Sequence, residues 1–126
     1  MKTDINLTEA EERLAQILWQ ESPIHSPELV LLASQLLGWK KSTTYTILKK
    51  LCDKGVFKNE NAKVTALLTS DELLARQSRR YVEDSFGGSL PRFIASFIGG
   101  GKKLTQTEAS ELKQLIAEFE SEGGNE

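Results

Sequence analysis

Apolar residues in the first third of the chain recur at spacings of three and four, which keeps side chains on one face of an α-helix. The first such segment opens at residues 8–11, Thr-Glu-Ala-Glu, where hydroxyl and carboxylate can each satisfy an orphan N–H as a capping box. The second follows Ser26, a predicted N-cap, and Pro27, and it ends at Gly38. The apolar positions of these two expected helices are Ala10, Leu14, Ile17, Leu18, Leu29, Val30, Leu32, Ala33, Leu36 and Leu37.

A third helix is predicted between Ser42, its expected N-cap, and Gly55, where a helix C-terminus favours a left-handed residue. Its apolar positions, which we expect to face a core, are Ile47, Leu48 and Leu51. The short glycine-containing link from the second helix to the third is typical of a helix-turn-helix.

A β-hairpin is expected directly after this helix. Val56 and Phe57 begin a strand, residues 59–62 form a turn, and residues 64–68 return. A hairpin in this position is the wing of a winged helix-turn-helix. We therefore expect a DNA-binding domain over residues 1–69, in a protein that is mainly α with a small β-hairpin wing.

Residues 70–126 show three more amphipathic segments, opened by residues 69–72, by Ser89-Leu90-Pro91 and by a second capping box at residues 105–108. Glycines at 87–88 and 99–101 separate them. So short a region is marginal as an independent domain, and exposed apolar faces usually mark an interface. We expect a helical homodimerisation domain, with these residues at the interface: Leu74, Tyr81, Phe86, Leu90, Phe93, Ile94, Phe97, Ile98, Leu112, Leu115, Ile116 and Phe119. The alternative is that these helices fold back on the first domain.

The charge of −2 is unevenly distributed along the chain. Residues 1–37 carry a net −4, residues 38–63 carry a net +5 from seven lysines against Asp53 and Glu60, and residues 64–126 carry a net −3. A positive segment between two negative ones indicates a localised face that binds a polyanion.

The third helix and the hairpin hold the candidate DNA-binding residues, which are Lys40, Lys41, Ser42, Thr43, Thr44, Tyr45, Thr46, Lys49, Lys50 and Lys63. Hydroxyl side chains suit base edges and phosphates in a major groove, and lysines suit the backbone. The plain alternative is a solvated lysine-rich helix, because a basic patch is an electrostatic footprint and not a motif.

Composition argues against several other functions. One cysteine, Cys52, excludes an internal disulfide, and with one histidine, His25, there is little to build a metal site or a catalytic centre. His25 is expected to be a loop or capping residue. We expect no enzyme activity and no cofactor or metal. No apolar run approaches the ~18 residues of a membrane span and no apolar leader opens the chain, so a cytoplasmic protein is expected.

In the order and identity of these motifs, the chain resembles the penicillinase-repressor family of bacterial winged-helix repressors. The resemblance is carried by residues 7–19 (LTEAEERLAQILW), 39–55 (WKKSTTYTILKKLCDKG), 86–98 (FGGSLPRFIASFI) and 104–116 (LTQTEASELKQLI). Trp19 stands at the usual tryptophan of the family's opening helix. The second motif resembles the recognition helix, and the last two resemble the dimerisation region.

The resemblance implies a dimeric repressor that binds palindromic operators. In the β-lactam-responsive members, a membrane sensor triggers cleavage within the dimerisation region, and the matching position here is Ser96-Phe97, with Ser in place of the family's Asn. The Cys-x-Cys motifs of the copper-responsive branch are absent. The wing departs from the usual Gly-Arg, with Ala62-Lys63 in its place.

Two functions stand against each other. The first is a repressor that binds its operator as a homodimer and is inactivated by cleavage in the dimerisation region. The second is a winged-helix interaction module that has lost sequence-specific DNA binding. The salt dependence of the binding affinity distinguishes the two functions, because contacts with DNA phosphates weaken steeply as the salt concentration rises.

Overall fold

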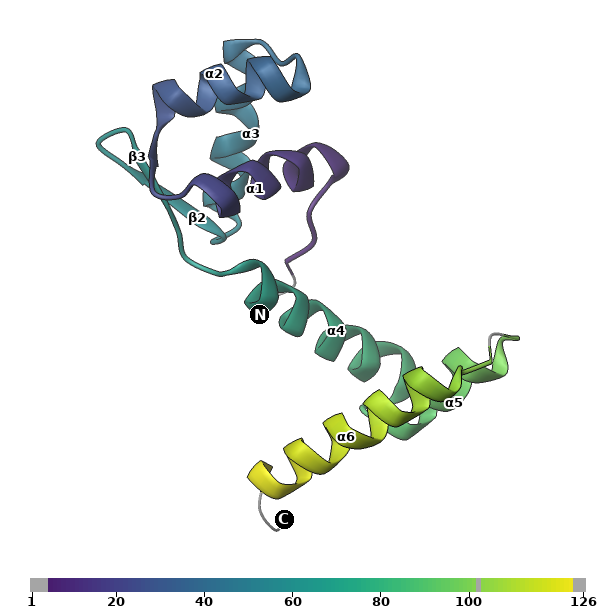
Figure 1. The fold of residues 1–126 in the computed structure, drawn as a ribbon. Helices are drawn as coiled ribbons and strands as arrows, with labels where there is room; N and C mark the ends of the chain where they lie inside the picture. Colours follow the sequence, from purple (N-terminus) through teal and green to yellow (C-terminus); the bar gives the residue numbers. More distant parts are fainter. Residues whose placement is uncertain (1–4, 102, 124–126) are drawn as a thin grey trace. The chain divides into compact units, whose positions relative to one another are not determined.

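The computed structural model describes residues 5–101 and 103–123 and divides into two units, Met1–Tyr81 and Val82–Glu126. Three helices and a three-stranded sheet form most of the first unit (Figure 1): α1 Glu9–Glu21, α2 Ser26–Leu37, α3 Lys41–Asp53, β1 Ile24–His25, β2 Phe57–Glu60 and β3 Lys63–Ala66. The antiparallel strands lie in the order β1-β3-β2. This is the predicted mainly α winged-helix fold.

The core of the first unit lies where α1, α2 and α3 meet one face of the sheet. Fully buried side chains come from every one of these elements or from the residue beside it, among them Leu14, Leu18, Leu29, Leu48, Leu51, Val56, Phe57 and Val64. The Trp19 ring lies 5.6 Å from the Phe57 ring between centroids, and its Nε1 donates a 2.9 Å hydrogen bond to the carbonyl of Leu68. Sequence periodicity placed most of these positions correctly, but Leu36 is 64% exposed, because only the line through Leu29 and Ala33 faces the core.

Most of the predicted helix caps are confirmed, and two predicted N-caps are wrong. Thr8 and Glu11 form the expected capping box on α1, and Gly38 adopts φ +70° after α2. The N-cap of α2 is His25, not Ser26, because β1 pairing continues through His25 and the chain turns into the helix at once. The N-cap of α3 is Lys40, not Ser42, since the Lys40 carbonyl already accepts the N–H of Thr44 at 3.0 Å.

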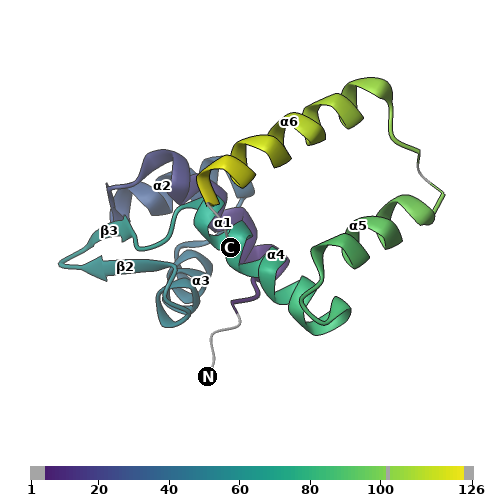
Figure 2. The same ribbon diagram turned by 90° about the horizontal axis from the view of Figure 1, so that it is seen from below.

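The hairpin has a tighter turn than the sequence indicated. Strands β2 and β3 pair up to Glu60 and Lys63, which leaves Asn61 and Ala62 as the whole turn. Both residues have positive φ, +53° and +64°, as a type I′ turn requires. Alanine is sterically strained at positive φ, whereas glycine is not. In Figure 2 this hairpin extends away from the helices of its unit. Strand β1 was not predicted, because two residues carry no readable periodicity.

Helix α4, Ser70–Phe86, begins in the first unit and continues into the second. A capping box opens it, with Thr69 N–H bonded to Glu72 at 2.9 Å and Glu72 N–H bonded to the Thr69 hydroxyl at 3.0 Å. Leu73 is only 3% exposed, so the start of α4 belongs to the first unit. The compact units divide after Tyr81, whereas the functional boundary after residue 69 stays a prediction.

The second unit holds the end of α4 with α5, Leu90–Gly99, and α6, Gln106–Gly123. Ser89 caps α5 by accepting the N–H of Arg92, and Thr105 and Glu108 form the predicted capping box on α6. The rings of Phe86 and Phe93 pack edge to face at 5.5 Å, and Phe93 lies 6.2 Å from Phe97. Apart from such partial contacts, this unit has no fully buried hydrophobic side chain among its described residues.

Candidate nucleic-acid interface

Helix α3 separates its side chains into a buried face and an exposed face. Thr44, Leu48 and Leu51 are buried at spacings of four and three and attach the helix to the core. The N-cap residue Lys40 is exposed, and the exposed side chains of the helix itself include Lys41, Ser42, Thr43, Thr46, Lys49 and Lys50. Hydroxyl groups and ammonium groups therefore share one surface, where the first can meet base edges and the second can meet phosphates.

Thr44 does not belong to this surface. Its side chain is fully buried, and its hydroxyl donates a 3.2 Å hydrogen bond to the carbonyl of Lys40. This burial argues against the predicted contact of Thr44 with DNA. The sequence carried the signal, because Thr44 precedes Leu48 by four residues and Leu51 by seven and so lies on the apolar line.

Tyr45 is half-buried and reaches toward α2. Its hydroxyl lies 3.4 Å from the hydroxyl of Ser26, which is itself 4% exposed. Tyr45 thus helps to fix α3 against α2. Its contact with DNA stays a prediction.

The lysines of α3 differ in what they can offer to a polyanion. Lys40, Lys41 and Lys50 are exposed, whereas Lys49 lies 3.2 Å from Asp53 in an exposed pair one turn along the helix. Exposed pairs of this kind contribute little to stability, so Lys49 can exchange Asp53 for a phosphate at small cost.

Lys54 has a different role, which the sequence did not reveal. Its Nζ lies 2.6 Å from Oε1 of Glu11, a carboxylate whose side chain is only 2% exposed. Burial raises the pKa of Glu11, but the Lys54 ammonium, the N–H of Thr8 and the charge of Lys50 together lower it below the ordinary value of 4.5. Lys54 therefore neutralises a buried carboxylate, and its charge does not belong to the polyanion-binding face.

The outward face of the sheet carries further charge. A shallow hollow of about 360 Å³ is lined by His25, Lys58, Glu60, Asn61, Lys63 and Thr65. Nζ of Lys58 lies 3.5 Å from Oε1 of Glu60, which reduces the availability of Lys58 for a phosphate. Lys63 is exposed at the base of the turn. The structure thus brings Lys63 beside His25, its partner across β1 and β3.

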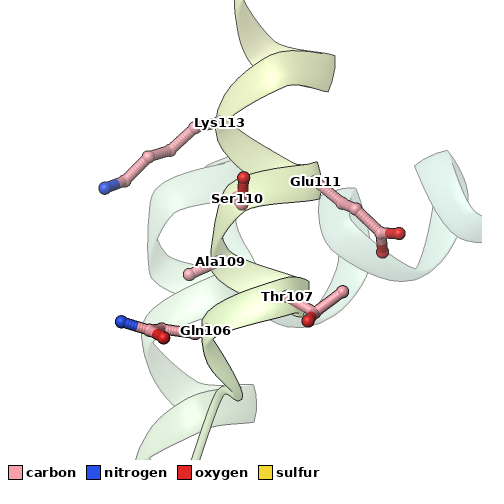
Figure 3. A pocket seen from close by; sticks show the side chains of 6 residues that line it. All are labelled: Gln106, Thr107, Ala109, Ser110, Glu111 and Lys113. Atoms are coloured by element: carbon pink, nitrogen blue, oxygen red, sulfur yellow. The ribbon is translucent and has the colours of Figure 1, made fainter.

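Other kinds of site find little support. The described residues contain no group of His, Cys, Asp and Glu that could hold a metal ion. Burial raises the pKa of the Cys52 thiol, which opposes a reactive thiolate. A depression of about 550 Å³ on α6 is lined by a single helix, and Figure 3 shows Gln106 and Lys113 extending to one side and Glu111 to the other. Side chains that do not converge cannot enclose a small ligand. Among the described residues, no helix is long and apolar enough to cross a membrane.

The residues expected at a dimer interface fall into two groups in the structure. The exposed group is Leu74, Tyr81, Leu90, Phe97, Leu115, Ile116 and Phe119. The half-buried group is Phe86, Phe93, Ile94, Ile98 and Leu112. An apolar groove of about 420 Å³ between α5 and α6 is lined by Phe97, Leu104, Leu112 and Leu115, with Glu108 and Glu111 beside them.

A helix-turn-helix followed by a hairpin wing, with hydroxyls and cations on the exposed face of the second helix, defines the winged-helix class of DNA-binding proteins. The comparisons with known proteins specify the family. The sequence model of the family described as "Penicillinase repressor" matches residues 7–118, and the chain belongs to this family. The protein is therefore a transcriptional regulator of the repressor type. DNA-binding repressors of this kind are not enzymes.

Individual relatives agree over most of the chain. It is 22% identical over 125 residues to a protein of Bacillus licheniformis named "Penicillinase repressor", covering 96% of this chain and 97% of the relative. It is 25% identical over 114 residues to an "Uncharacterized 16.5 kDa protein in ptsI 3'region" of Latilactobacillus sakei, covering 87% of this chain and 77% of the relative.

Proposed function

We propose that this chain represses transcription as a homodimer that binds a palindromic operator, with α3 of each protomer in a major groove. The observation that carries the proposal is the division of α3 into a buried apolar face and an exposed face of hydroxyls and lysines. Thr43 and Thr46 lie nearest the base edges in this proposal, and Lys40, Lys41, Lys50 and Lys63 contact the phosphate backbone.

The second unit supports a dimer because no apolar side chain in its described part is fully buried. Phe97, Ile116 and Phe119 are 57%, 63% and 64% exposed. Exposed apolar area of this kind costs about 25 cal/mol for each Å² that stays in water, so a second copy covering it is favoured. A two-fold dimer also sets two α3 helices on the two half-sites of a palindrome.

Release from the operator by proteolysis is a further part of the proposal. Ser96 and Phe97, which match the family's cleavage position, are both exposed on α5. Cleavage of a helical bond requires local opening of the helix, which is cheap in a segment with little buried area. A membrane sensor with a linked protease would then act on the region that holds the dimer together.

The test is fluorescence-anisotropy binding to the promoter upstream of the gene for this protein, against a scrambled duplex, at two salt concentrations. A repressor binds the promoter selectively and loses affinity by powers of ten as salt rises a few-fold. Binding that is weak and insensitive to salt supports instead an interaction module that has lost sequence-specific DNA binding.

Lys41→Ala sharpens this test. Removal of one phosphate contact should weaken binding to all sequences alike and reduce the slope of log K against log salt by about 1. Lys113→Ala, on the exposed surface of α6, is the matched control and should leave the slope unchanged. If Lys41→Ala keeps the wild-type affinity and slope, the exposed face of α3 is misassigned as the DNA-binding surface.

A further inference from the structure

Residues 5–8, which we call the N-terminal strap, join the two helices that an operator-binding dimer has to coordinate. The carbonyl of Asn6 accepts a 2.7 Å hydrogen bond from Nζ of Lys54, the C-cap residue of α3. The carbonyl of Ile5 accepts a 3.0 Å hydrogen bond from Nε2 of Gln77 in α4. The strap is therefore bonded to the end of the DNA-reading helix and to the helix that leads out of the first unit.

The connection to α3 is reinforced by a buried charge. Nζ of Lys54 also donates to Oε1 of Glu11 at 2.6 Å, and the same oxygen accepts the N–H of Thr8 at 2.9 Å. A charge-assisted bond with a buried carboxylate has a narrow range of favourable geometries. Lys54 thus fixes the end of α3 to α1 and to the strap together.

The connection to α4 depends on few contacts. Leu73 packs into the first unit, and one turn further along Gln77 provides the bond to Ile5. The side chains of Ile5 and Leu7 lie half-buried against the core, so the strap itself is held in place. Leu73 and the Gln77 amide therefore hold the start of α4 against the first unit.

We propose that Glu11, Lys54 and Gln77 are positioning residues that make the dimer selective for the distance between operator half-sites. The inference depends on the proposed function. Shifting a half-site by one base pair moves it about 3.4 Å along the duplex and rotates it about 35° around the axis. A dimer in which α3 and the start of α4 are held together cannot follow this shift, whereas a dimer with a loosened strap can.

The first experiment uses full-length protein and operators that the wild-type chain itself selects from a random duplex library. Binding is then measured to the selected palindrome, to the same duplex with one base pair inserted at its centre, and to a single half-site. We expect the insertion to weaken wild-type binding at least about tenfold. Gln77→Met keeps the side-chain volume and removes the amide, and it should reduce that penalty to about two- to threefold with half-site affinity unchanged.

Two further variants complete the design. Gln16→Met replaces an exposed glutamine of α1 and should keep the wild-type insertion penalty. The double variant Glu11→Gln, Lys54→Met removes both charges, so that neither is left buried alone, and it should reduce the penalty as Gln77→Met does. Circular dichroism establishes that each variant is folded. A residue that merely stabilises the fold would change affinity for the three duplexes in parallel and leave their ratio unchanged.

The outcomes separate the strap from the proposed function. If the wild-type chain selects no palindrome, the proposed function fails and the strap proposal fails with it. If it selects a palindrome but tolerates the insertion, or if Gln77→Met keeps the full penalty, only the strap proposal is overturned.

Discussion

Phe57 in the first unit and Phe97 in the second both lie on regular secondary structure, yet Phe57 is fully buried and Phe97 is 57% exposed. The same contrast holds between Leu14 of α1, fully buried, and Ile116 of α6, 63% exposed. The first unit closes its core with its own helices and sheet. The second is amphipathic, and none of its described hydrophobic side chains is fully buried. The first unit therefore has the buried core that independent folding requires, whereas the exposed apolar faces of the second are what the proposed dimer would cover.

The largest expected effect tests whether the first unit is stabilised by its own core. Phe57→Ala removes a fully buried ring that packs on Trp19 and should lower the free energy of unfolding by about 3–5 kcal/mol. Urea denaturation followed by tryptophan fluorescence measures it. Leu31→Ala, at a position 62% exposed, is the control and should change stability by less than about 0.5 kcal/mol. Equal effects from the two changes would refute the assignment of the core.

The next prediction tests whether the second unit forms the proposed dimer interface. Phe97→Asp places a carboxylate in the lining of the apolar groove and should convert the proposed dimer to a monomer in sedimentation equilibrium, at a cost of about 2–4 kcal/mol in association. The first unit should stay folded, with its tryptophan spectrum unchanged. Ser110→Asp adds the same charge at an exposed position of α6 and should leave the dimer intact. A dimer that survives Phe97→Asp places the interface elsewhere.

A smaller effect is expected on the pH dependence of stability, and it should come from Glu11 in the first unit. The folded-state pKa of Glu11 lies below its ordinary value of 4.5, so its contribution to stability is present above that pH and is lost as the pH falls through the lower folded-state value. Urea midpoints of wild type and Glu11→Gln should therefore converge below about pH 4.5. Control variant Glu12→Gln, at an exposed neighbouring position, should show no such convergence. A constant gap across the acid range would mean that the Glu11 charge is not what stabilises the fold.

The smallest predicted change is a gain. Ala62 adopts φ +64° in the hairpin turn, and Ala62→Gly should stabilise the first unit by up to about 1 kcal/mol because glycine occupies that region without steric strain. Thermal unfolding detects a gain of that size. Ala66→Gly, in β3, should instead destabilise. A loss of stability on Ala62→Gly would contradict the observed turn conformation.

Local signals in the sequence were sufficient for most of the fold. The capping boxes at Thr8 and Thr105 and the glycine stops at Gly38 and Gly55 depend only on neighbouring residues, and the structure contains all four. Ser42 shows the limit of such reasoning. Several residues near a helix start can cap it, and the choice of Lys40 depends on how α3 packs after the turn.

Contacts between distant residues were not predictable in the same way. The lysine at position 54 looked like part of a basic surface, and only the folded chain shows it beside Glu11, 43 positions earlier in the sequence. Thr44 is the opposite case, since the spacing to Leu48 already placed it on the buried face. The hydroxyl suggested DNA contact, but helical periodicity was the stronger physical argument.

The course of α4 across the two units has a practical consequence for protein engineering. The natural place to cut the DNA-binding part from this chain is after Tyr81, in the middle of a helix, and not in the loop after β3. A graft that ended at residue 69 would discard Leu73 and Gln77 and leave the hydrophobic site for Leu73 open to water. Fused at Tyr81 in continuous helical phase, the same module could be joined to a foreign coiled coil, and the length of the added helix would then become an adjustable parameter of the chimera.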